Sequence, residues 1–375
     1  MTLDQLRALG YAVDTGEEID PNEQRVTGTA AAIAAPGYFL FNSREPPSAQ
    51  LVDQTGRLVH SWSHPDHLHW SNVELLRNGD LLVPGFRSRS DAGGKASVGR
   101  SLTRLSWEGQ ELWSRAIEAH HDVEMMPTGD IAVLTYRMRR IGEINPETDV
   151  KDVSIVFLDG DGVVKAEHSL YAMLAANPDV FQFQPVAVSQ SKEGLDEIDL
   201  LHANSLEFFR ESPLSKSDPF YAAGRVLVSF RHQDTVAIFD LDQQEVVWSW
   251  GQGEISGNHD ATLLANGNIL LFDNGLARNW SRVIEVDPRK REIVWEYRAT
   301  PPDRFYSRSF GSNQRLPNGN TLIANSDNGR AFIVTPEGEV VWRFLNPNAG
   351  PDGGRLRIVR IKQYPVEWIE TLTGP

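Results

Sequence analysis

The feature that most constrains the fold is a repeated unit of two short strands joined by a turn, whose second strand usually ends on Leu-Trp or Val-Trp. Six such units end at residues 60, 113, 165, 248, 295 and 342. They recur about every 50 residues, with one longer interval after residue 165. Strand pairs repeated at this period are typical of β-propellers, in which each repeat forms one blade.

A second repeated element alternates with the first. Residues 73–83, 123–133, 261–271 and 313–323 each contain two apolar runs joined by Asn-Gly or Thr-Gly. These dipeptides favour a tight hairpin because the turn requires positive φ. A fifth, degenerate copy spans residues 206–228. Two hairpins give four strands per unit, so the sequence predicts an all-β, six-bladed propeller.

The chain begins part-way through a blade. Residues 38–41 and 51–62 supply only the outer strands of the first blade, and one more strand-like run, residues 356–362, remains after Trp342. We expect this run to be the missing inner strand, so that the carboxyl-terminal strand closes the ring and hides the sheet edges. The propeller is then one domain over residues 36–365, followed by a tail at 366–375.

Two segments fall outside the repeat. Residues 1–35 are predicted to form a short amphipathic helix, ending near Gly10, and a polar linker. The long interval contains an insertion, residues 168–200, in which residues 170–176 have a helical pattern. It is interpreted either as a lid over one mouth of the channel or as a plain structural insertion.

Composition excludes several classes of function. The net charge of −15 disfavours non-specific binding to nucleic acid or to anionic membranes, and no apolar run is long enough to span a bilayer. The absence of cysteine excludes disulfides and zinc–thiolate sites. The amino terminus lacks a basic region followed by an apolar core, which predicts a cytoplasmic location. A periplasmic or secreted location is the alternative if a leader was removed.

Residues just before the inner hairpins are expected to meet at one mouth of the channel, because inner strands line it. They include His121, His202 and His259. Histidine is a poor choice for an apolar strand, and converging titratable groups are typical of functional clefts. The alternative is that these histidines only fasten neighbouring blades. The other histidines outside this pattern are expected to be surface or packing groups: His60, His64, His67, His168 and His232.

Arg231 follows a strand and has two interpretations. It either forms a blade-to-blade ion pair or points into the channel, where a guanidinium can hold an oxyanion with two donors. The nearby histidines favour the second interpretation.

Four of these segments, in this order on a propeller repeat, resemble the bacterial arylsulfate sulfotransferases, which do not use the nucleotide sulfate donor. They are residues 120–122 (His-His-Asp), 199–205 (Asp-Leu-Leu-His-Ala-Asn-Ser), 229–233 (Ser-Phe-Arg-His-Gln) and 258–260 (Asn-His-Asp). The resemblance covers residues 36 to 345. It implies that His259 is transiently sulfated, that His121 and His202 support it, and that Arg231 holds the sulfuryl group.

The resemblance further implies sulfuryl transfer from an aryl sulfate to a phenol, without a cofactor. Asn204, Tyr136, Phe230 and Tyr306 are expected to contact the substrate. The chain departs from the family's secreted members, which have a signal peptide, a separate amino-terminal β domain and a cysteine pair. Asp260, directly after the expected nucleophile, is also unexpected, because an adjacent carboxylate raises the pKa of a histidine.

Two other functions remain open at this point. His121, His202 and His259 can instead bind a divalent metal in a propeller lyase or oxygenase, with aspartates behind them. The chain can also be a non-catalytic scaffold that binds another protein through its rim. Whether two chains pair as a homodimer is left open.

Overall fold

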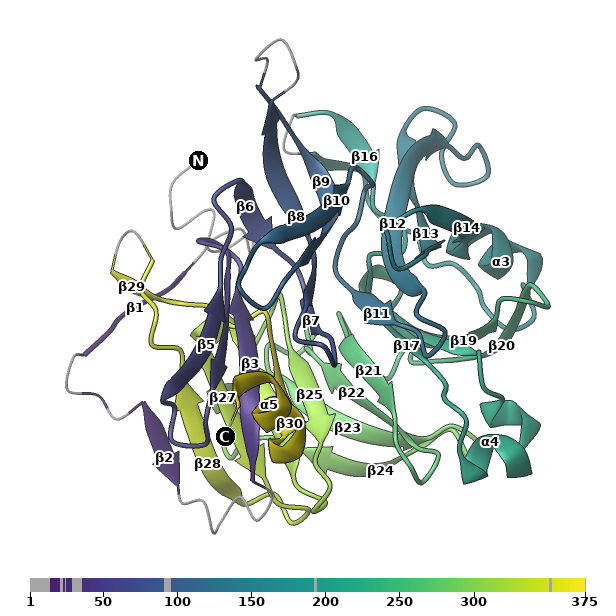
Figure 1. Ribbon diagram of the computed structural model, residues 1–375. Helices are drawn as coiled ribbons and strands as arrows, with labels where there is room; N and C mark the ends of the chain where they lie inside the picture. The colour runs from purple at the N-terminus through teal and green to yellow at the C-terminus, as the bar shows by residue number, and fades with distance from the viewer. Residues whose placement is uncertain are drawn as a thin grey trace.

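The protein is a six-bladed β-propeller with three short helices in its described part. The computed structural model describes residues 14–20, 23, 25–28, 36–90, 96–191, 194–350 and 353–374. The blades are arranged around a central axis, with the innermost strands facing one another (Figure 1). The predicted fold is confirmed. The helix expected before Gly10 lies outside the described residues.

Each blade is an antiparallel sheet of four main strands that follow one another from the axis outward. The first contains β30 (Arg360–Pro365), β3 (Gly37–Ser43), β4 (Ser48–Val52) and β5 (Leu58–Trp62). In the second, the innermost position is shared by β6 (His67–Trp70) and β7 (Glu74–Leu75), followed by β8 (Leu81–Ser90), β9 (Ala96–Leu105) and β10 (Glu111–Arg115). The third contains β11 (Val123–Met125), β12 (Ile131–Arg140), β13 (Asp149–Leu158) and β14 (Val164–Ser169).

The remaining three blades are more regular. The fourth contains β17 (Ala203–Phe208), β18 (Val226–Phe230), β19 (Thr235–Asp240) and β20 (Glu245–Trp250). The fifth contains β21 (His259–Leu263), β22 (Ile269–Asp273), β23 (Arg282–Asp287) and β24 (Glu292–Tyr297). The sixth contains β25 (Ser312–Arg315), β26 (Thr321–Asn325), β27 (Arg330–Val334) and β28 (Val340–Leu345).

Ring closure by the carboxyl-terminal strand occurs as predicted, but over different residues. The expected run 356–362 is split: β29 (Gly354–Leu356) pairs with β1 (Asp14–Glu18), and the inner strand β30 starts only at Arg360 and pairs with β3. The split arises where the chain crosses from the rim to the axis. There the backbone N–H of Val359 donates to the carbonyl oxygen of Asn42 before regular pairing begins.

The segments expected to be a linker and a tail both contain regular structure. β2 (Val26–Gly28) adds a fifth strand to the outer edge of the sixth blade by pairing with β28, which covers that edge. After β30 the chain forms helix α5 (Val366–Thr373), whose Ile369 is buried beside Tyr364 in the core of the first two blades. No helix in the described part of the chain is long and apolar enough to cross a membrane.

The insertion after the third blade is well structured where it is described. The helix predicted at residues 170–176 is present as α3 (Leu170–Ala176), with the Ser169 hydroxyl accepting the Ala172 backbone N–H as a cap. A small hairpin follows, formed by β15 (Ser189–Gln190) and β16 (Asp196–Ile198), and β16 pairs in parallel with β13. In the fourth blade a loop with helix α4 (Pro213–Ser217) replaces the tight turn between β17 and β18.

The repeated tryptophans explain how the outer parts of the blades are joined. The indole N–H of Trp113 donates to the Gly160 carbonyl of the next blade at 3.1 Å. Trp295 and Trp342 make the equivalent bonds to Pro336 at 2.7 Å and, across the closure, to Gln54 at 3.2 Å. His60, at the repeat position of the first blade, makes the same contact with the Trp107 carbonyl through its imidazole at 2.7 Å.

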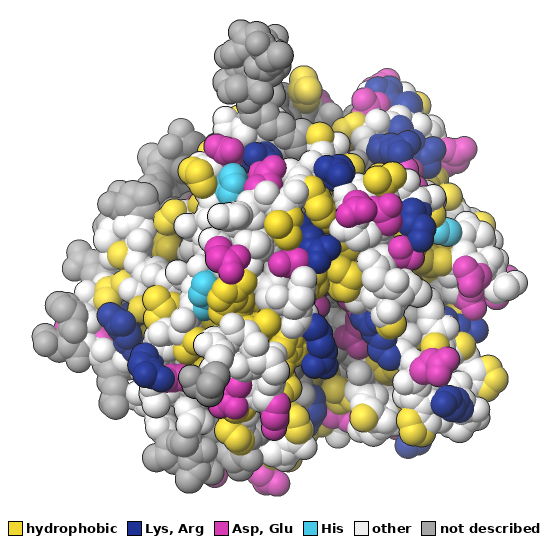
Figure 2. Space-filling model, in the orientation of Figure 1, with side chains coloured by type: hydrophobic (Ala, Val, Ile, Leu, Met, Phe, Trp, Pro, Cys, Tyr) yellow, Lys and Arg dark blue, Asp and Glu magenta, His cyan; other side chains and the backbone are white. Residues whose placement is uncertain are grey.

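A second set of contacts joins the blades along the channel. A side chain on one inner strand accepts a backbone N–H from the next inner strand. Asp122 accepts from Leu206, and Asp260 accepts from Asn313, at 3.2 and 2.7 Å. Ser205 and Ser312 play the same role toward Ala261 and Ile361. Basic and acidic side chains are interspersed on the face drawn in Figure 2, so the net negative charge does not form a single patch there.

The closure depends on a buried charge pair that can be tested. Asp122 lies 2.7 Å from the Arg360 guanidinium of β30, and both side chains are buried. We expect Asp122→Ala to lower the free energy of unfolding by roughly 3–5 kcal/mol, because it removes the nearest carboxylate from the buried Arg360 and leaves it with Glu74, 3.8 Å away. The measurement is urea unfolding. Arg57→Ala, which removes an exposed pair with Asp53, is the control and should cost less than about 1 kcal/mol. Equal losses in the two variants would contradict this role.

Glu207, on the inner strand β17, is expected to make the stability depend on pH. Burial and the neighbouring Glu124 raise the pKa of Glu207 to about 8. The folded protein therefore keeps a proton that the unfolded chain releases, so stability falls as the pH rises from about 4.5 through about 8. Glu207→Gln should remove this part of the slope and gain stability over the wild type toward pH 9. Unfolding at several pH values measures it, and exposed Glu337→Gln should run parallel to the wild type.

Candidate functional site

One cavity of about 390 Å³ lies where the inner strands begin, and it is lined by His121, His202, His259 and Arg231. His259 starts β21. His202 directly precedes β17 and His121 lies two residues before β11, both in left-handed backbone, with φ of 47° and 55°. Arg231 follows β18 in a short 3₁₀ turn. The propeller thus brings four residues that are far apart in the sequence into one site.

The imidazole of His259 is held by two acceptors. Its Nδ1 lies 2.7 Å from Oδ1 of Asn274 and 3.0 Å from the carbonyl oxygen of Gly257. Two acceptors at Nδ1 place the proton there and leave Nε2 with a free lone pair. Burial, together with the positive charge of Arg231, lowers the pKa of His259 to about 3. His259 is therefore a neutral imidazole at physiological pH.

Asp260 does not have the effect expected from its position next to His259. Its Oδ2 accepts the backbone N–H of Asn313, 2.7 Å away, and its backbone is left-handed, with φ of 50°. The carboxylate is thereby committed to the next blade, and its strongest favourable charge interaction is with Arg360. The expectation that it raises the pKa of His259 is wrong, because that pKa is lowered.

His202 has a carboxylate partner instead of an amide. Its Nδ1 lies 2.6 Å from Oδ2 of Asp199, and the Lys151 ammonium lies 3.7 Å from the same oxygen. Although burial opposes ionisation, His202 and Lys151 hold the pKa of Asp199 well below its usual range. The ring of His202 is 4.8 Å from that of His121, centroid to centroid. Asp199 and His202 form a dyad, and both residues line the cavity.

Arg231 is a partly buried cation that forms no ion pair with any described residue. In the described part of the chain no carboxylate lies within 4.0 Å of its guanidinium, and its Nε has no hydrogen-bond partner there. Its Nη1 lies 3.1 Å from Nε2 of His232, and its Nη2 lies 3.5 Å from the Arg308 carbonyl oxygen. The alternative of a blade-to-blade ion pair is therefore not what the structure contains. A partly buried guanidinium whose Nε is buried without a partner favours an anion in the cavity.

His232 was expected to be a surface or packing group, but it belongs to the site. Its Nδ1 lies 2.6 Å from the Asp199 carbonyl oxygen, its ring is 4.5 Å from that of His202, and it lines the cavity. Burial lowers its pKa to about 4. Its place beside Arg231 in the motif at residues 229–233 was the available signal.

The four expected substrate contacts divide into two pairs. Asn204 and Tyr136 line the cavity, where Phe86 and Phe310 add further aromatic surface. Phe230 does not: it is fully buried and packs against Phe181 and Phe239 between blades. Alternation along β18 explains this, since Phe230 faces the core before the chain turns at Arg231. Tyr306 is not among the lining residues either; Phe310 of the same loop is.

The insertion forms part of the wall of the cavity. Ser189, Gln190, Glu197 and Asp199 line it, and Lys151 of β13 bonds to Glu197 at 2.6 Å. The segment is also held from behind by Gln233, whose Oε1 accepts the Gln184 backbone N–H at 2.7 Å. The insertion thus contributes residues to the site. Its opening and closing as a lid stays a prediction.

A metal would find one set of ligands among the described residues. Asp199, His202 and His232 place ligand atoms within 4.8 Å of one another. Only His202 belongs to the set expected from the sequence. These atoms are already committed to hydrogen bonds, and the cations Lys151 and Arg231 lie beside them. The donor set therefore fits a network of hydrogen bonds better than a divalent ion.

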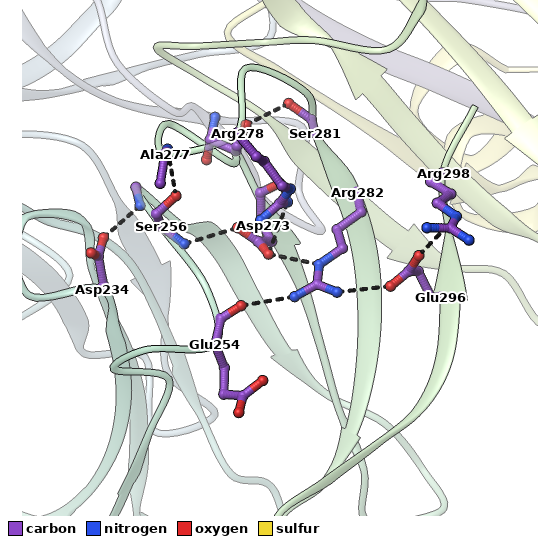
Figure 3. Close-up of polar contacts among 12 residues, drawn as sticks. Asp234, Glu254, Ser256, Asp273, Ala277, Arg278, Ser281, Arg282, Glu296 and Arg298 are labelled. Carbon is purple, nitrogen blue, oxygen red and sulfur yellow. Dashed lines mark hydrogen bonds and ion pairs between the residues drawn. The ribbon is translucent and has the colours of Figure 1, made fainter. Parts of the chain in front are cut away.

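A polar network joins the chain next to Gly257 to the chain next to Asn274, the two residues whose oxygens face Nδ1 of His259. Figure 3 shows its members Asp234, Ser256, Asp273, Arg278 and Arg282. The buried carboxylate of Asp273 accepts the backbone N–H of Ser256 and pairs with Arg278 and Arg282, at 3.0 and 2.8 Å. Asp234 accepts the N–H of Gly257 at 2.7 Å. The network holds residues 256–257 against residues 273–274, and so fixes the backbone on which the His259 acceptors lie.

A model of the arylsulfotransferase (ASST) family matches residues 97–347, which is more than half of the chain. The chain belongs to this family. The matched region contains His121, His202, Arg231 and His259, so the resemblance seen in the sequence is confirmed. Sulfotransferase activity in general follows from family membership.

The similarity to solved structures shows only the fold, because the sequence identities are 14% or lower. A protein of unknown function from Bacteroides caccae is 14% identical, with a TM-score of 0.52, and the match covers 88% of this chain and 99% of that one. A periplasmic gluconolactonase from Pseudomonas aeruginosa is 13% identical, with a TM-score of 0.47 and coverage of 88% and 100%. A streptogramin B lyase is 12% identical, with a TM-score of 0.47 and coverage of 94% and 95%. No curated protein sequence matches the chain.

Proposed function

We propose that this arylsulfotransferase moves a sulfuryl group from an aryl sulfate to a phenol through a sulfated His259. The observation that supports it most is that one cavity holds both a cation and a neutral nucleophile. The cation is Arg231, a partly buried guanidinium without a carboxylate partner among the described residues, and the nucleophile is the neutral His259. An anion completes the charge balance of the cavity, and a neutral imidazole is a competent nucleophile toward it.

The first half-reaction is a displacement at sulfur. Nε2 of His259 forms a bond to sulfur while the bond from sulfur to the aryl oxygen breaks, so the phenolate leaves with the electron pair. The histidine then carries a neutral zwitterion, with a positive ring and a negative sulfonate, and the total charge is unchanged. Sulfuryl transfer resembles phosphoryl transfer in its loose transition state, so positioning and charge stabilisation supply most of the catalysis.

Arg231 is assigned the equatorial sulfuryl oxygens. Its planar guanidinium presents donors in a fixed fork, which suits two oxygens of one group. Tyr136, Phe86 and Phe310 supply aromatic surface for the aryl ring.

The Asp199–His202 dyad is assigned the proton transfers. A carboxylate at Nδ1 stabilises the imidazolium form, so in this proposal His202 starts with protons on both nitrogens. It gives its Nε2 proton to the departing phenolate and becomes neutral. In the second half-reaction the same nitrogen takes the proton of the incoming phenol, which attacks the sulfur of sulfated His259. The Nε2–sulfur bond breaks, and His259 returns to its neutral form. His121, 4.8 Å from His202 between ring centroids, is the other candidate for this role.

The nucleophile can be tested directly. We expect 4-nitrophenyl sulfate with a phenol acceptor to release nitrophenolate, and His259→Asn to abolish the release. After brief exposure to donor, the intact wild-type protein should gain about 80 Da, the mass of one sulfuryl group, on His259. His168→Asn, outside the cavity, is the matched control and should retain activity. Absence of both release and adduct across a panel of acceptors would overturn the proposed function.

The role of the guanidinium gives a second test. Arg231→Lys keeps the positive charge but removes the planar pair of N–H donors, so kcat/KM for the donor should fall by roughly 10²-fold. Arg225→Lys, at the other end of the same strand, is the control and should change activity by less than about threefold, since it replaces a partly exposed ion pair. Steady-state kinetics with 4-nitrophenyl sulfate measures both variants. Equal kcat/KM values for Arg231→Lys and Arg225→Lys would show that the paired donors of Arg231 do not bind the sulfuryl group.

A further inference from the structure

We propose that Asn274 is a positioning residue, which holds His259 in the tautomer with the proton on Nδ1 and so presents Nε2 as the nucleophile. This inference rests on the proposed function and adds the residue that prepares the nucleophile for it. Asn274 follows β22, is fully buried, and is not among the residues that line the cavity. It acts only through His259.

The orientation of the Asn274 amide follows from its surroundings. Its Nδ2 lies 2.7 Å from the Ser307 carbonyl oxygen and 2.9 Å from that of Phe310. Two carbonyl oxygens can be satisfied only by an NH₂ group, so Oδ1 must be the atom that faces His259. An amide turned the other way would face two acceptors with an acceptor. The amide oxygen is therefore fixed as the partner of Nδ1.

This fixed oxygen determines where the imidazole proton lies. Because Asn274 Oδ1 and the Gly257 carbonyl oxygen both face Nδ1, a lone pair on that nitrogen would be repelled from two sides. The proton is held on Nδ1, and Nε2 keeps its lone pair. A histidine without such partners divides its proton between the two nitrogens and loses part of its nucleophilic form.

An amide is better suited than a carboxylate to this nucleophile. A carboxylate at Nδ1 would favour imidazolium, which has no lone pair for attack, whereas a neutral amide leaves the ring neutral. When Nε2 binds sulfur the ring becomes positive, and the hydrogen bonds from Nδ1–H to Asn274 and Gly257 strengthen. The same contact therefore prepares the reactant and stabilises the charge that develops.

The backbone around Asn274 is held in place by the network of Figure 3. The Ser281 hydroxyl donates to the Asn274 carbonyl oxygen at 2.9 Å and accepts the Ser307 backbone N–H at 3.0 Å. Asp273, the preceding residue, has no exposed surface and pairs with Arg278 and Arg282. Asn274 thus has little freedom to turn, as a positioning role requires.

The test compares Asn274→Leu with Asn274→Asp. Leucine has a similar size but no acceptor. Aspartate presents an oxygen to Nδ1 whether or not it is ionised. In ¹⁵N NMR of histidine-labelled protein, assigned with His259→Gln, we expect the wild type to show a protonated Nδ1 and a free Nε2. Asn274→Asp should keep Nδ1 protonated, with a part of the protein shifted to imidazolium by the carboxylate. Asn274→Leu should show a mixture of tautomers. For the donor, kcat/KM should fall by roughly 10²-fold in Asn274→Leu and recover in part in Asn274→Asp.

Asn346→Leu is the matched control. Asn346 is another fully buried asparagine whose amide donates to backbone carbonyls, but it lies outside the cavity. Its variant should lose stability without changing the His259 signals or kcat/KM. An unchanged Nδ1–H tautomer in Asn274→Leu would overturn the proposal. Tautomers that change as expected in a protein without sulfuryl transfer would uphold the role of Asn274 and overturn the proposed function instead.

Discussion

The closed ring depends on inner-strand side chains that accept backbone hydrogen bonds from the next blade. Asp122 and Asp260 make these contacts, and each directly follows a histidine of the cavity, His121 or His259. The residue that joins two blades and the residue that faces the cavity are therefore neighbours in the chain. A shift of one blade against the next would move these histidines together with the contact, so the geometry of the site depends on the closure of the ring.

The repeat predicted the architecture because its physical basis is local in each unit. A tryptophan near the end of an outer strand reaches the turn of the next blade, and this contact recurs at Trp113, Trp295 and Trp342. His60 shows that the position, and not the indole itself, is what recurs. The strand at residues 356–362 was misplaced because its apolar pattern continues across the bend at residues 357–359, where the chain changes from one sheet to another.

The site was less predictable than the fold, because side-chain direction depends on contacts between distant segments. Phe230 and Arg231 are adjacent, yet one packs in the core and the other faces the cavity. Asp260 looked like a partner of His259 but bonds to Asn313 of the next blade. Asn274 could not be found at all, since it meets His259 only through the pairing of β21 with β22. The repeat predicted which segments meet at the cavity, but not the partner of each atom.

The two histidines of the proposed mechanism differ mainly in what faces Nδ1. His202 has the carboxylate of Asp199, which stabilises a proton on the ring and suits a group that gives and takes protons. His259 has the amide of Asn274, which fixes the tautomer without adding charge and suits a nucleophile that must stay neutral. Burial and the charge of Arg231 favour the same division, because together they lower the pKa of His259. Exchanging the two partners would favour imidazolium at His259, where a lone pair is needed. The division of roles therefore follows from the oxygen that faces Nδ1 of each imidazole, which is a carboxylate oxygen at His202 and an amide oxygen at His259.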